Sequence, residues 1–471
     1  MTLYQDIADR TAALIADGVL RPGERLPSVR QACRRHGVSP VTVTQAYHLL
    51  ESRGLIEARP KSGYFVRARL GHGLPEPAMS DPVGEATALQ VSDFIFQILD
   101  SVRDPAIVPL GSSFPSPDLY PLDKLGRFLA GAGRKLAPLS TVTDLPPGNE
   151  ELRRQIALRY LAQGAAVSPQ EIVITSGALE GINLCLQALT RPGDLIAVES
   201  PTFYAGLQAS ERLGLKVVEI PSHPREGVSL DALAGALRRH PVKACLFMLN
   251  FSNPTGSRVP DENRRALVEL LRRHQVPLIE DDVYAELYFG RDAPAAAKAL
   301  DADGLVLHVS SFSKCLAPGY RVGWVAAGRH AREVQRQKFS TSLATAVPLQ
   351  VALAGYMKRG GFDAHLRSLR RQLAEQEAML VAGIERHFPP GIRLARPDGG
   401  YFLWLELPPQ ADGLRLHQQA LACGISIAPG PIFSATREFR NYLRLNFGHP
   451  AGARQDEALR TLGALIGQQL A

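Results

Sequence analysis

Short apolar runs alternate with helix-like stretches through the middle of the chain, and this alternation constrains the fold more than any other feature. The apolar runs, each bounded by turn residues, are 172–175, 195–198, 216–220, 244–249, 277–280, 305–309 and 322–326. Helical periodicity falls between several of them, as at 179–189, 230–239 and 263–274. Strands that alternate with helices in this way are typical of an α/β domain with a mostly parallel, buried sheet.

The pattern changes toward the end of the chain. From Phe362 a long helical stretch is followed by shorter strand-like and helical segments, with a strand near 442–446. This pattern predicts a small α+β subdomain over about 362–471, inside a larger domain of 88–471. A chain of 471 residues is too long for one core, so we expect another domain before it.

Positive charge is concentrated at the start of the chain. Residues 1–70 hold 11 Lys and Arg against 6 Asp and Glu, which is +5 of a total formal charge of +7. The remaining 400 or so residues are therefore nearly neutral. A small basic head on a near-neutral body indicates a module that binds a polyanion.

The head reads as three helices followed by two short strands. The first helix is expected over 4–17, and the second begins after an N-cap at Ser28. The third is expected over 41–52, after the N-cap Ser39 and Pro40 at its first position. Strands are expected at 55–56 and 63–66, with a basic turn between them. Two helices joined by a glycine turn, the second rich in hydroxyl and amide side chains, are typical of a helix-turn-helix. The alternative is a plain three-helix bundle with a solvated basic face.

The head resembles the winged helix-turn-helix DNA-binding domain of the GntR family, over residues 1–68. The matching segments are 26–30 (LPSVR), 37–39 (GVS), 42–43, 46–47, 50, 54–56 (GLI) and 61–66 (KSGYFV). The resemblance implies contacts to double-stranded operator DNA from Ser28, Arg30, Ser39, Thr42, Thr44, Gln45, Lys61 and Ser62. Arg30 and Lys61 would bind phosphates, whereas Thr42 and Gln45 would read bases. Pro40 and Lys61 stand where many relatives have arginine and glycine, so the base preference does not transfer.

Residues 69–87 are rich in glycine and proline and show little apolar pattern, which predicts a semi-stiff linker. Five scattered cysteines without a CxxC pair argue against a disulfide framework and a metal site. Asp6 and Asp9 stand where a signal peptide would be basic and then apolar, and no apolar run approaches a membrane span. We therefore expect a cytoplasmic protein.

Polar and aromatic residues follow the predicted strands, at the edge where α/β sheets bind ligands. After the strand at 172–175, the N–H groups of Gly177, Ala178 and Leu179 open a helix and suit a phosphate. After the next strand, Phe203 is placed to stack on an aromatic ring, with Tyr204 as the alternative.

Two further strands end in polar groups. Asn253, in an Asn-Pro-Thr-Gly turn, is expected to donate a hydrogen bond to a ring hydroxyl that Tyr284 would share. Asp281 would keep a pyridine nitrogen protonated, and Asp282 is expected on the opposite face as part of a solvated acidic turn.

The segment Ser310–Gly323 completes the set. Lys314 lies among hydroxyl residues at a strand end and is placed to hold an aldehyde covalently. Ser311, Ser313 and Arg321 would form a phosphate cup. These groups are what pyridoxal 5'-phosphate (PLP) needs.

In order and spacing these features resemble the fold-type I aminotransferases. The segment 144–148 with Glu151 and Arg153 looks like the substrate-side loop of that family, and Arg444 matches the arginine that binds the α-carboxylate of an amino acid. A GntR-type head joined to such a domain resembles the MocR subfamily of transcriptional regulators.

The resemblance implies a regulator that senses PLP, an amino acid or an amine. Lys314 would hold PLP as an internal aldimine until an incoming amine displaces it, in a head-to-tail homodimer. One alternative is an active aminotransferase with an accessory DNA-binding head. Another is a repressor that uses the fold only as a dimeric scaffold, without PLP.

Overall fold

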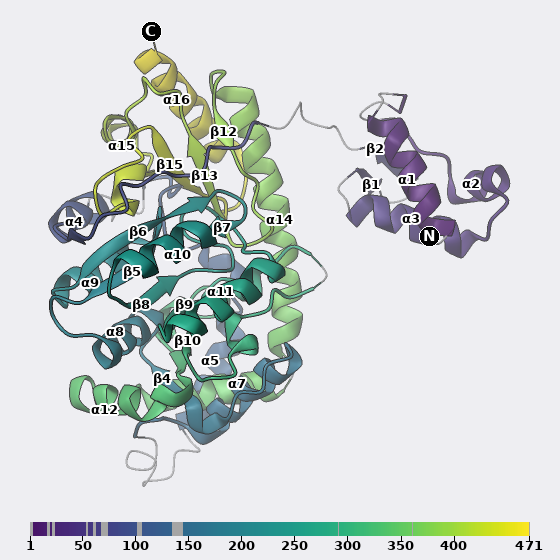
Figure 1. Ribbon diagram of the computed structural model, residues 1–471. Coiled ribbons are helices and arrows are strands. Elements are labelled where there is room, and N and C mark those ends of the chain that lie inside the picture. Colours follow the sequence, from purple (N-terminus) through teal and green to yellow (C-terminus); the bar gives the residue numbers. More distant parts are fainter. Residues whose placement is uncertain are drawn as a thin grey trace. The chain divides into compact units, whose positions relative to one another are not determined.

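The protein divides into two compact units, Met1–Gly73 and Leu74–Ala471 (Figure 1). The computed structural model describes residues 3–16, 19–20, 24–52, 55–59, 63–66, 74–100, 106–133, 145–290, 292–359 and 361–470. In the part of the chain so described, no helix is both long and apolar enough to cross a membrane.

The first unit consists of three helices and a two-stranded antiparallel sheet. Its elements are α1 (Leu3–Ala16), α2 (Val29–His36), α3 (Pro40–Ser52), β1 (Ile56–Arg59) and β2 (Gly63–Val66). Before α2, Ser28 Oγ accepts the N–H of Gln31 while the Gln31 side chain accepts the N–H of Ser28, which forms a capping box. Gly37 ends α2 with φ 66°, a left-handed conformation that glycine adopts at little cost. The predicted winged helix-turn-helix fold is confirmed.

One small core holds these elements together. Its buried residues are Ile7, Ala8, Ile15, Leu26, Ala32, Val43, Ala46, Tyr47, Leu50, Ile56 and Val66. The Tyr47 hydroxyl donates to the carbonyl of Pro27, which fixes α3 against the segment before α2. Leu14 is 39% exposed and lies outside this core.

The second unit is built on a mostly parallel sheet, as expected. Its strands are β3 (Thr87–Ala88), β4 (Ile172–Thr175), β5 (Leu195–Ser200), β6 (Lys216–His223), β7 (Gly227–Val228), β8 (Val242–Phe247), β9 (Leu278–Asp281), β10 (Val306–Ser311) and β11 (Gly323–Ala326). The strand order is β3-β6-β5-β8-β9-β10-β11-β4, and β7 pairs with β6. β11 runs antiparallel to both neighbours, and β3 and β7 are antiparallel to β6.

Helices cover both faces of this sheet (Figure 1). The helices are α4 (Ser92–Asp100), α5 (Leu122–Gly133), α7 (Glu150–Ala162), α8 (Ala178–Leu189), α9 (Tyr204–Arg212), α10 (Leu230–Arg239), α11 (Asp261–His274), α12 (Ala331–Thr341) and α13 (Val347–Lys358). Side chains alternate across each strand, so Ile196 and Val198 join the core under α8 and α9 while Ala197 joins the core under α10 and α11. Both faces of the sheet are apolar and covered by helices. For this reason the strands appear in the sequence as continuous apolar runs.

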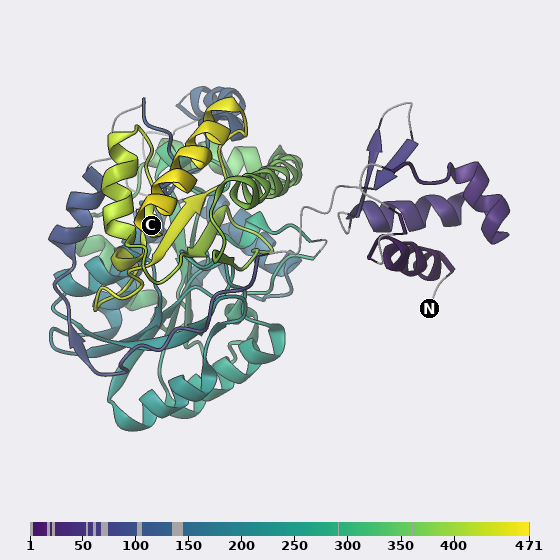
Figure 2. The ribbon, with the colours of Figure 1, turned by 90° about the horizontal axis from the view of Figure 1, so that it is seen from above.

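The C-terminal part forms the expected small α+β subdomain. Its strands β12 (Arg393–Leu394), β13 (Phe402–Glu406), β14 (Ala428–Pro429) and β15 (Tyr442–Asn446) form an antiparallel sheet of order β12-β13-β15-β14. Its helices are α14 (Gly361–His387), α15 (Gly413–Ala422) and α16 (Ala453–Leu470). In Figure 2 the yellow α16 lies beside the end of the green α14, where Asp456 pairs with Arg386 and His387.

Residues 74–88, which we call the strap, depart from the predicted linker. The carbonyl of Pro75 accepts the N–H of Leu394, Ser80 Oγ donates to the carbonyl of Ser200 (2.5 Å), and Thr87 pairs with Val217. The linker prediction was wrong for this stretch, because most of its contacts are made by backbone groups, the Ser80 hydroxyl and the Glu76 carboxylate, which pairs with Arg225, and these leave no apolar pattern in the sequence. Residues 69–73 lie outside the described residues.

Candidate cofactor site and DNA-binding face

A cavity of about 260 Å³ opens at the carboxyl ends of the parallel strands. Nine of the residues that the sequence predicts for a cofactor line it: Ala178, Leu179, Phe203, Asp281, Tyr284, Ser311, Ser313, Lys314 and Arg321. Tyr204, the alternative to Phe203, also lines it, and the centroids of these two rings are 4.6 Å apart. The fold therefore brings together groups that are widely separated along the chain.

One end of the cavity is suited to an anion. Gly177 is the N-cap of α8, and no side chain caps that helix, so its first N–H groups are available. Arg321 Nη1 donates to Ser313 Oγ (2.9 Å) from a residue in the left-handed conformation (φ 50°). A Cβ on Gly177 would lie 2.5 Å from Arg321 Nη2, and φ at Gly177 is +89°, so both space and backbone require glycine here.

Lys314 is the lysine that lines the cavity. Its Nζ donates to the carbonyl of Ser113 (2.9 Å) and lies 4.0 Å from the centroid of the Phe114 ring. Burial lowers the pKa of the Lys314 amine to about 7; the cations of Arg444 and Arg321 act in the same direction and Asp281 opposes them. A large fraction of the amine is therefore neutral and nucleophilic near neutral pH.

Asp281 supplies an acceptor that lacks a donor. Burial, together with the neighbouring Asp282, raises the pKa of Asp281 to about 7, while Lys314 lowers it. Asp281 Oδ1 is buried and has no hydrogen-bond partner among the described residues. Buried acceptors are rarely left unpaired, and a protonated pyridine nitrogen would pair this one. Because Asp281, Lys314 and Arg321 line one cavity, the cavity fits PLP, which supplies an electron sink when bound.

Asp282 is not the solvated acidic turn that its sequence suggests. It is buried, accepts a hydrogen bond from Asn250 Nδ2 (3.0 Å), and its Oδ2 lies 2.9 Å from His308 Nε2. His308 Nδ1 in turn lies 2.6 Å from the Tyr160 hydroxyl. Burial alone would lower the pKa of His308, but the hydrogen bond to Asp282 and the nearby carboxylates raise it. The prediction was wrong because the partners come from neighbouring elements.

Asn253 and Arg444 lie together behind the cavity. Asn253 Nδ2 donates to the Tyr284 hydroxyl (3.4 Å), and Arg444 Nη1 donates to Asn253 Oδ1 (2.8 Å). Arg444 is 0% exposed, and its Nη2 donates to the carbonyl of Gly111 (2.7 Å). Its Nε has no partner among the described residues. β15 thus carries a fully buried guanidinium.

The sequence did not point to Ser113 and Phe114, which also line the cavity. The carbonyl of Ser113 accepts from Lys314 Nζ and from the Tyr401 hydroxyl (3.1 Å), and Ser113 Oγ lies 2.9 Å from the Tyr204 hydroxyl. Locally these residues belong to a Gly-Ser-Ser-Phe-Pro turn, and nothing in that turn signals contacts some 200 residues away.

In the head, the described residues expected to contact DNA are the N-cap of α2, one residue of α2, Ser39 in the turn before α3, and three residues of α3. Ser28, Arg30, Ser39 and Gln45 are exposed, and Thr42 and Thr44 are half-buried. The Thr44 hydroxyl donates to the carbonyl of Pro40 (2.8 Å), so it is partly committed within the helix. Lys61 and Ser62 lie outside the described residues.

Comparisons with known proteins agree with both units. Residues 138–461 match the family described as Aminotransferase class I and II, and residues 3–66 match the bacterial regulatory proteins of the gntR family. The uncharacterized HTH-type transcriptional regulator YdcR of Escherichia coli is 47% identical over 470 residues, covering 100% of both chains.

Two solved structures resemble the second unit. A Pyrococcus horikoshii kynurenine aminotransferase in complex with PMP has a TM-score of 0.75 at 29% identity, covering 81% of this chain and 96% of its own. The Thermus thermophilus α-aminoadipate aminotransferase LysN, complexed with N-(5'-phosphopyridoxyl)-L-leucine, has a TM-score of 0.73 at 26% identity, covering 81% and 99%.

The fold and these similarities define the second unit as a fold-type I domain of aminotransferase class I and II, with PLP as its cofactor. Because the similarity to YdcR extends over the whole chain, it includes the head as well as this domain. The chain belongs to the GntR-type transcriptional regulators that carry such a domain, the MocR-like architecture.

Proposed function

We propose that an amino acid entering the cavity controls the affinity of the head for operator DNA. The observation that carries this proposal is the convergence of two cationic groups on the same short segment. Lys314 Nζ donates to the carbonyl of Ser113 (2.9 Å), and Arg444 Nη2 donates to the carbonyls of Gly111 and Ser112. A ligand with an amine next to a carboxylate would replace these contacts, the amine at the Lys314 position and the carboxylate at Arg444.

Each residue then has a defined task. Lys314 anchors the cofactor, Asp281 holds the proton on the pyridine nitrogen, and the turn at Gly177 with Arg321 holds the phosphate. Arg444 selects ligands that carry a carboxylate. The ligand can shift the protein between two states only by as much as its affinity for them differs.

The DNA-binding side of the proposal requires two heads. We propose a head-to-tail homodimer in the cytoplasm, because proteins with this domain are usually dimers and a pair of winged helices would bind two operator half-sites. Ser28, Arg30, Ser39, Thr42, Thr44, Gln45, Lys61 and Ser62 are the proposed contacts.

The test measures DNA affinity with PLP bound and a panel of ligands added. For each amino acid the panel includes its N-acetyl derivative, which lacks the free amine, and the corresponding amine, which lacks the carboxylate. We expect at least one amino acid to change the DNA Kd by about tenfold, a coupling free energy of about 1.4 kcal/mol. We expect its N-acetyl derivative to have no effect and the amine to need a higher concentration. An equal response to the N-acetyl derivative would overturn the role of Lys314.

A second function, transamination, is favoured by one observation: Lys314, Asp281, Tyr284 and Arg444 are all present in one site. Multiple-turnover assays with amino acid and 2-oxo acid pairs would test it. Fast turnover without any effect on DNA affinity would favour the enzyme over the regulator. DNA affinity that changes with neither PLP nor amines would favour a repressor that uses the second unit as a scaffold and functions without PLP.

A further inference from the structure

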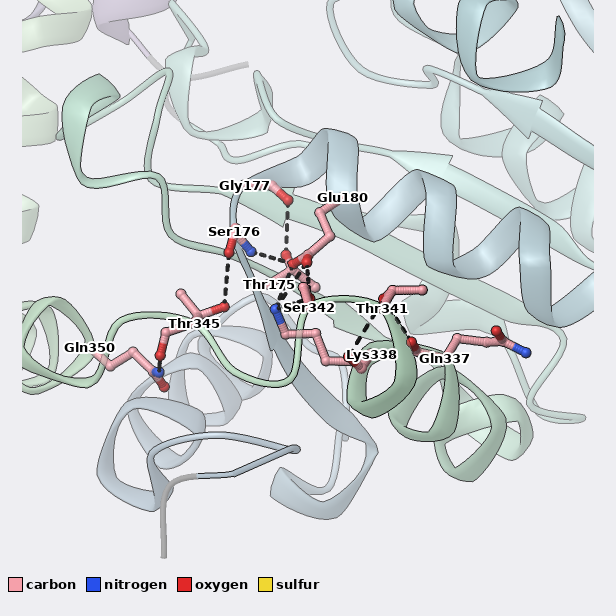
Figure 3. Close-up of polar contacts among 10 residues, drawn as sticks. All are labelled: Thr175, Ser176, Gly177, Glu180, Gln337, Lys338, Thr341, Ser342, Thr345 and Gln350. Atoms are coloured by element: carbon pink, nitrogen blue, oxygen red, sulfur yellow. Dashed lines mark hydrogen bonds and ion pairs between the residues drawn. The ribbon is translucent and has the colours of Figure 1, made fainter. Parts of the chain in front are cut away.

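An ion pair between Lys338 and Glu180 joins α12 to the first turn of α8, close to the turn at Gly177 (Figure 3). Lys338, on α12, has a side chain that is 1% exposed, and its Nζ donates to both carboxylate oxygens of Glu180 (3.0 and 2.8 Å). Glu180 belongs to the first turn of α8, the helix whose N-terminus faces the cavity. The Glu180 side chain is 18% exposed and keeps some contact with water, but removing Lys338 still leaves its charge without the cation that offsets it.

Glu180 also determines the shape of the turn before α8. Its Oε2 accepts the N–H of Ser176 (2.6 Å), the residue directly before Gly177. This bond occupies the N–H just before the helix, while no side chain caps Gly177 and the N–H groups that follow it. Figure 3 shows the Glu180 carboxylate turned back toward Ser176 and Lys338. The N–H groups that remain are those expected to bind phosphate.

A carboxylate at this position creates an electrostatic problem. A phosphate monoester carries close to two negative charges near neutral pH, and a second anion in the same turn repels it. Burial would raise the pKa of Glu180, but hydrogen bonds from Lys338, Ser342 and the N–H of Ser176 outweigh it and lower the pKa. Glu180 therefore remains charged, and Lys338 is the cation that neutralises it.

The pair is also connected to the elements beyond α12. Ser342 Oγ donates to Glu180 Oε1 (2.5 Å), and Ser176 Oγ lies 3.3 Å from Thr345 Oγ1. Gln350 on α13 donates to the carbonyl of Thr345 (2.8 Å) and accepts the N–H of Asn149 (2.9 Å), the N-cap of α7. Three helix ends are thus fixed around the turn that precedes α8.

We propose that Glu180 and Lys338 are positioning residues that hold the Ser176–Leu179 turn and cancel its carboxylate charge, so that the site accepts the phosphate of the cofactor. The inference rests on the placement of the phosphate at Gly177 and not on any response of DNA binding to amines. Because Lys338 offsets the Glu180 charge, that carboxylate does not oppose the phosphate, and the cavity can bind phosphorylated pyridoxal in preference to pyridoxal.

The experiment titrates the full-length protein with PLP and, separately, with pyridoxal, and follows the visible absorption that each gains on binding Lys314. We expect Lys338→Met to weaken PLP binding by about tenfold or more, because the Glu180 charge becomes uncompensated. Pyridoxal has no phosphate, so its affinity should change by less than about threefold. Equal losses for both ligands, or no loss for either, would overturn the proposal.

Three further variants separate charge from folding. Glu180→Gln keeps the acceptor for Ser176 but removes the charge, so it should bind PLP at least as tightly as the wild type. The double variant Glu180→Gln/Lys338→Met should bind PLP to within about threefold of the wild type. Arg336→Met removes an exposed cation from the same helix, where Arg336 pairs with Glu333, and should leave both affinities unchanged.

If Lys338→Met does not fold, Glu180→Gln alone still decides the matter. A loss of PLP affinity in that variant of more than about tenfold, with pyridoxal unaffected, would show that the Glu180 charge favours the phosphate and would overturn the proposal. DNA binding that does not respond to amines would contradict the proposed function while leaving these affinities untouched.

Discussion

Arg30 in the head is exposed, whereas Arg444 in the second unit is fully buried and held by Asn253 and backbone carbonyls. The same contrast holds for the two binding regions as a whole. The proposed DNA contacts among the described residues are exposed or half-buried groups on or directly before α2 and α3, while the cavity holds Lys314 and Asp281 with pKa values shifted by burial.

Exposed charges interact through water and are screened within about 10 Å at 0.1 M salt. Buried charges are screened far less, but their protonation depends on their surroundings. We therefore expect DNA binding by the head to depend mainly on salt concentration, and PLP binding in the cavity to depend mainly on pH. The predictions below test this difference, beginning with the largest effect.

Replacing Lys314 should have the largest effect. In Lys314→Ala the visible absorption that PLP gains on binding the lysine should be lost entirely, because no other amine lines the cavity among the described residues. Binding of the PLP-free protein to DNA should stay within about threefold of the wild type, since the head is a separate unit. Lys216→Ala, at an exposed position on β6, is the matched control and should keep the absorption. Persistence of the absorption in Lys314→Ala would refute the site.

The pH dependence of PLP binding to Lys314 is expected to be the next largest effect. The pKa of Lys314 is lowered to about 7, so the neutral amine predominates above that pH and the protonated, unreactive form below it. The apparent affinity should therefore fall by up to about tenfold per unit below pH 7 and level off above about pH 8. Absorbance titrations across this range measure it. A profile that still rises steeply between about pH 9 and 10 would mean that the amine keeps its ordinary pKa.

Arg30→Ala should weaken DNA binding severalfold and make the dependence of log Kd on log salt shallower by about one. The physical reason is that an exposed arginine bound to a phosphate releases one counterion. Titrations at several salt concentrations measure the slope. Arg10→Ala is the control, because Arg10 is also exposed (72%) but is paired with Asp6 on α1. An unchanged slope in Arg30→Ala would remove this contact from the proposed interface.

The smallest effect is expected for Ser28→Ala. Ser28 Oγ accepts the N–H of Gln31, and loss of such a cap costs about 1 kcal/mol. The midpoint of the thermal transition in which the head unfolds measures this cost. Thr11→Ala, which removes a hydroxyl that only donates to the carbonyl of Ile7, should be neutral or slightly stabilising. If Ser28→Ala weakens DNA binding no more than its loss of stability explains, Ser28 acts only as a cap and is not one of the DNA contacts.

Much of the secondary structure could be predicted because it depends on interactions between residues that are near one another in the sequence. The sequence predicts α10 over 230–239 and β4 over 172–175, and the structure has the same bounds. Periodicity fixes the interior of such elements, and Ser28 and Gly37 mark the ends of α2 because their cap geometry depends on neighbouring residues alone.

Contacts between distant segments were not predictable in this way. Ser113 lies against Lys314, 201 residues further along, and Glu180 pairs with Lys338 across 158 residues. The sequence around Asp282 suggests a solvated carboxylate, but in the fold β10 places His308 beside it. The cofactor residues are an intermediate case, because each follows a strand and the carboxyl ends of parallel strands meet at one edge.

The strap has a consequence for solubility. β3, at its end, is the outermost strand of the large sheet and pairs with Val217 and Lys216 of β6. If the chain began after residue 88, the backbone N–H and C=O groups of β6 at that edge would be open to pairing with another molecule. Two residues of extended chain thus cover the start of β6 at this edge of the sheet, which limits strand-to-strand pairing there.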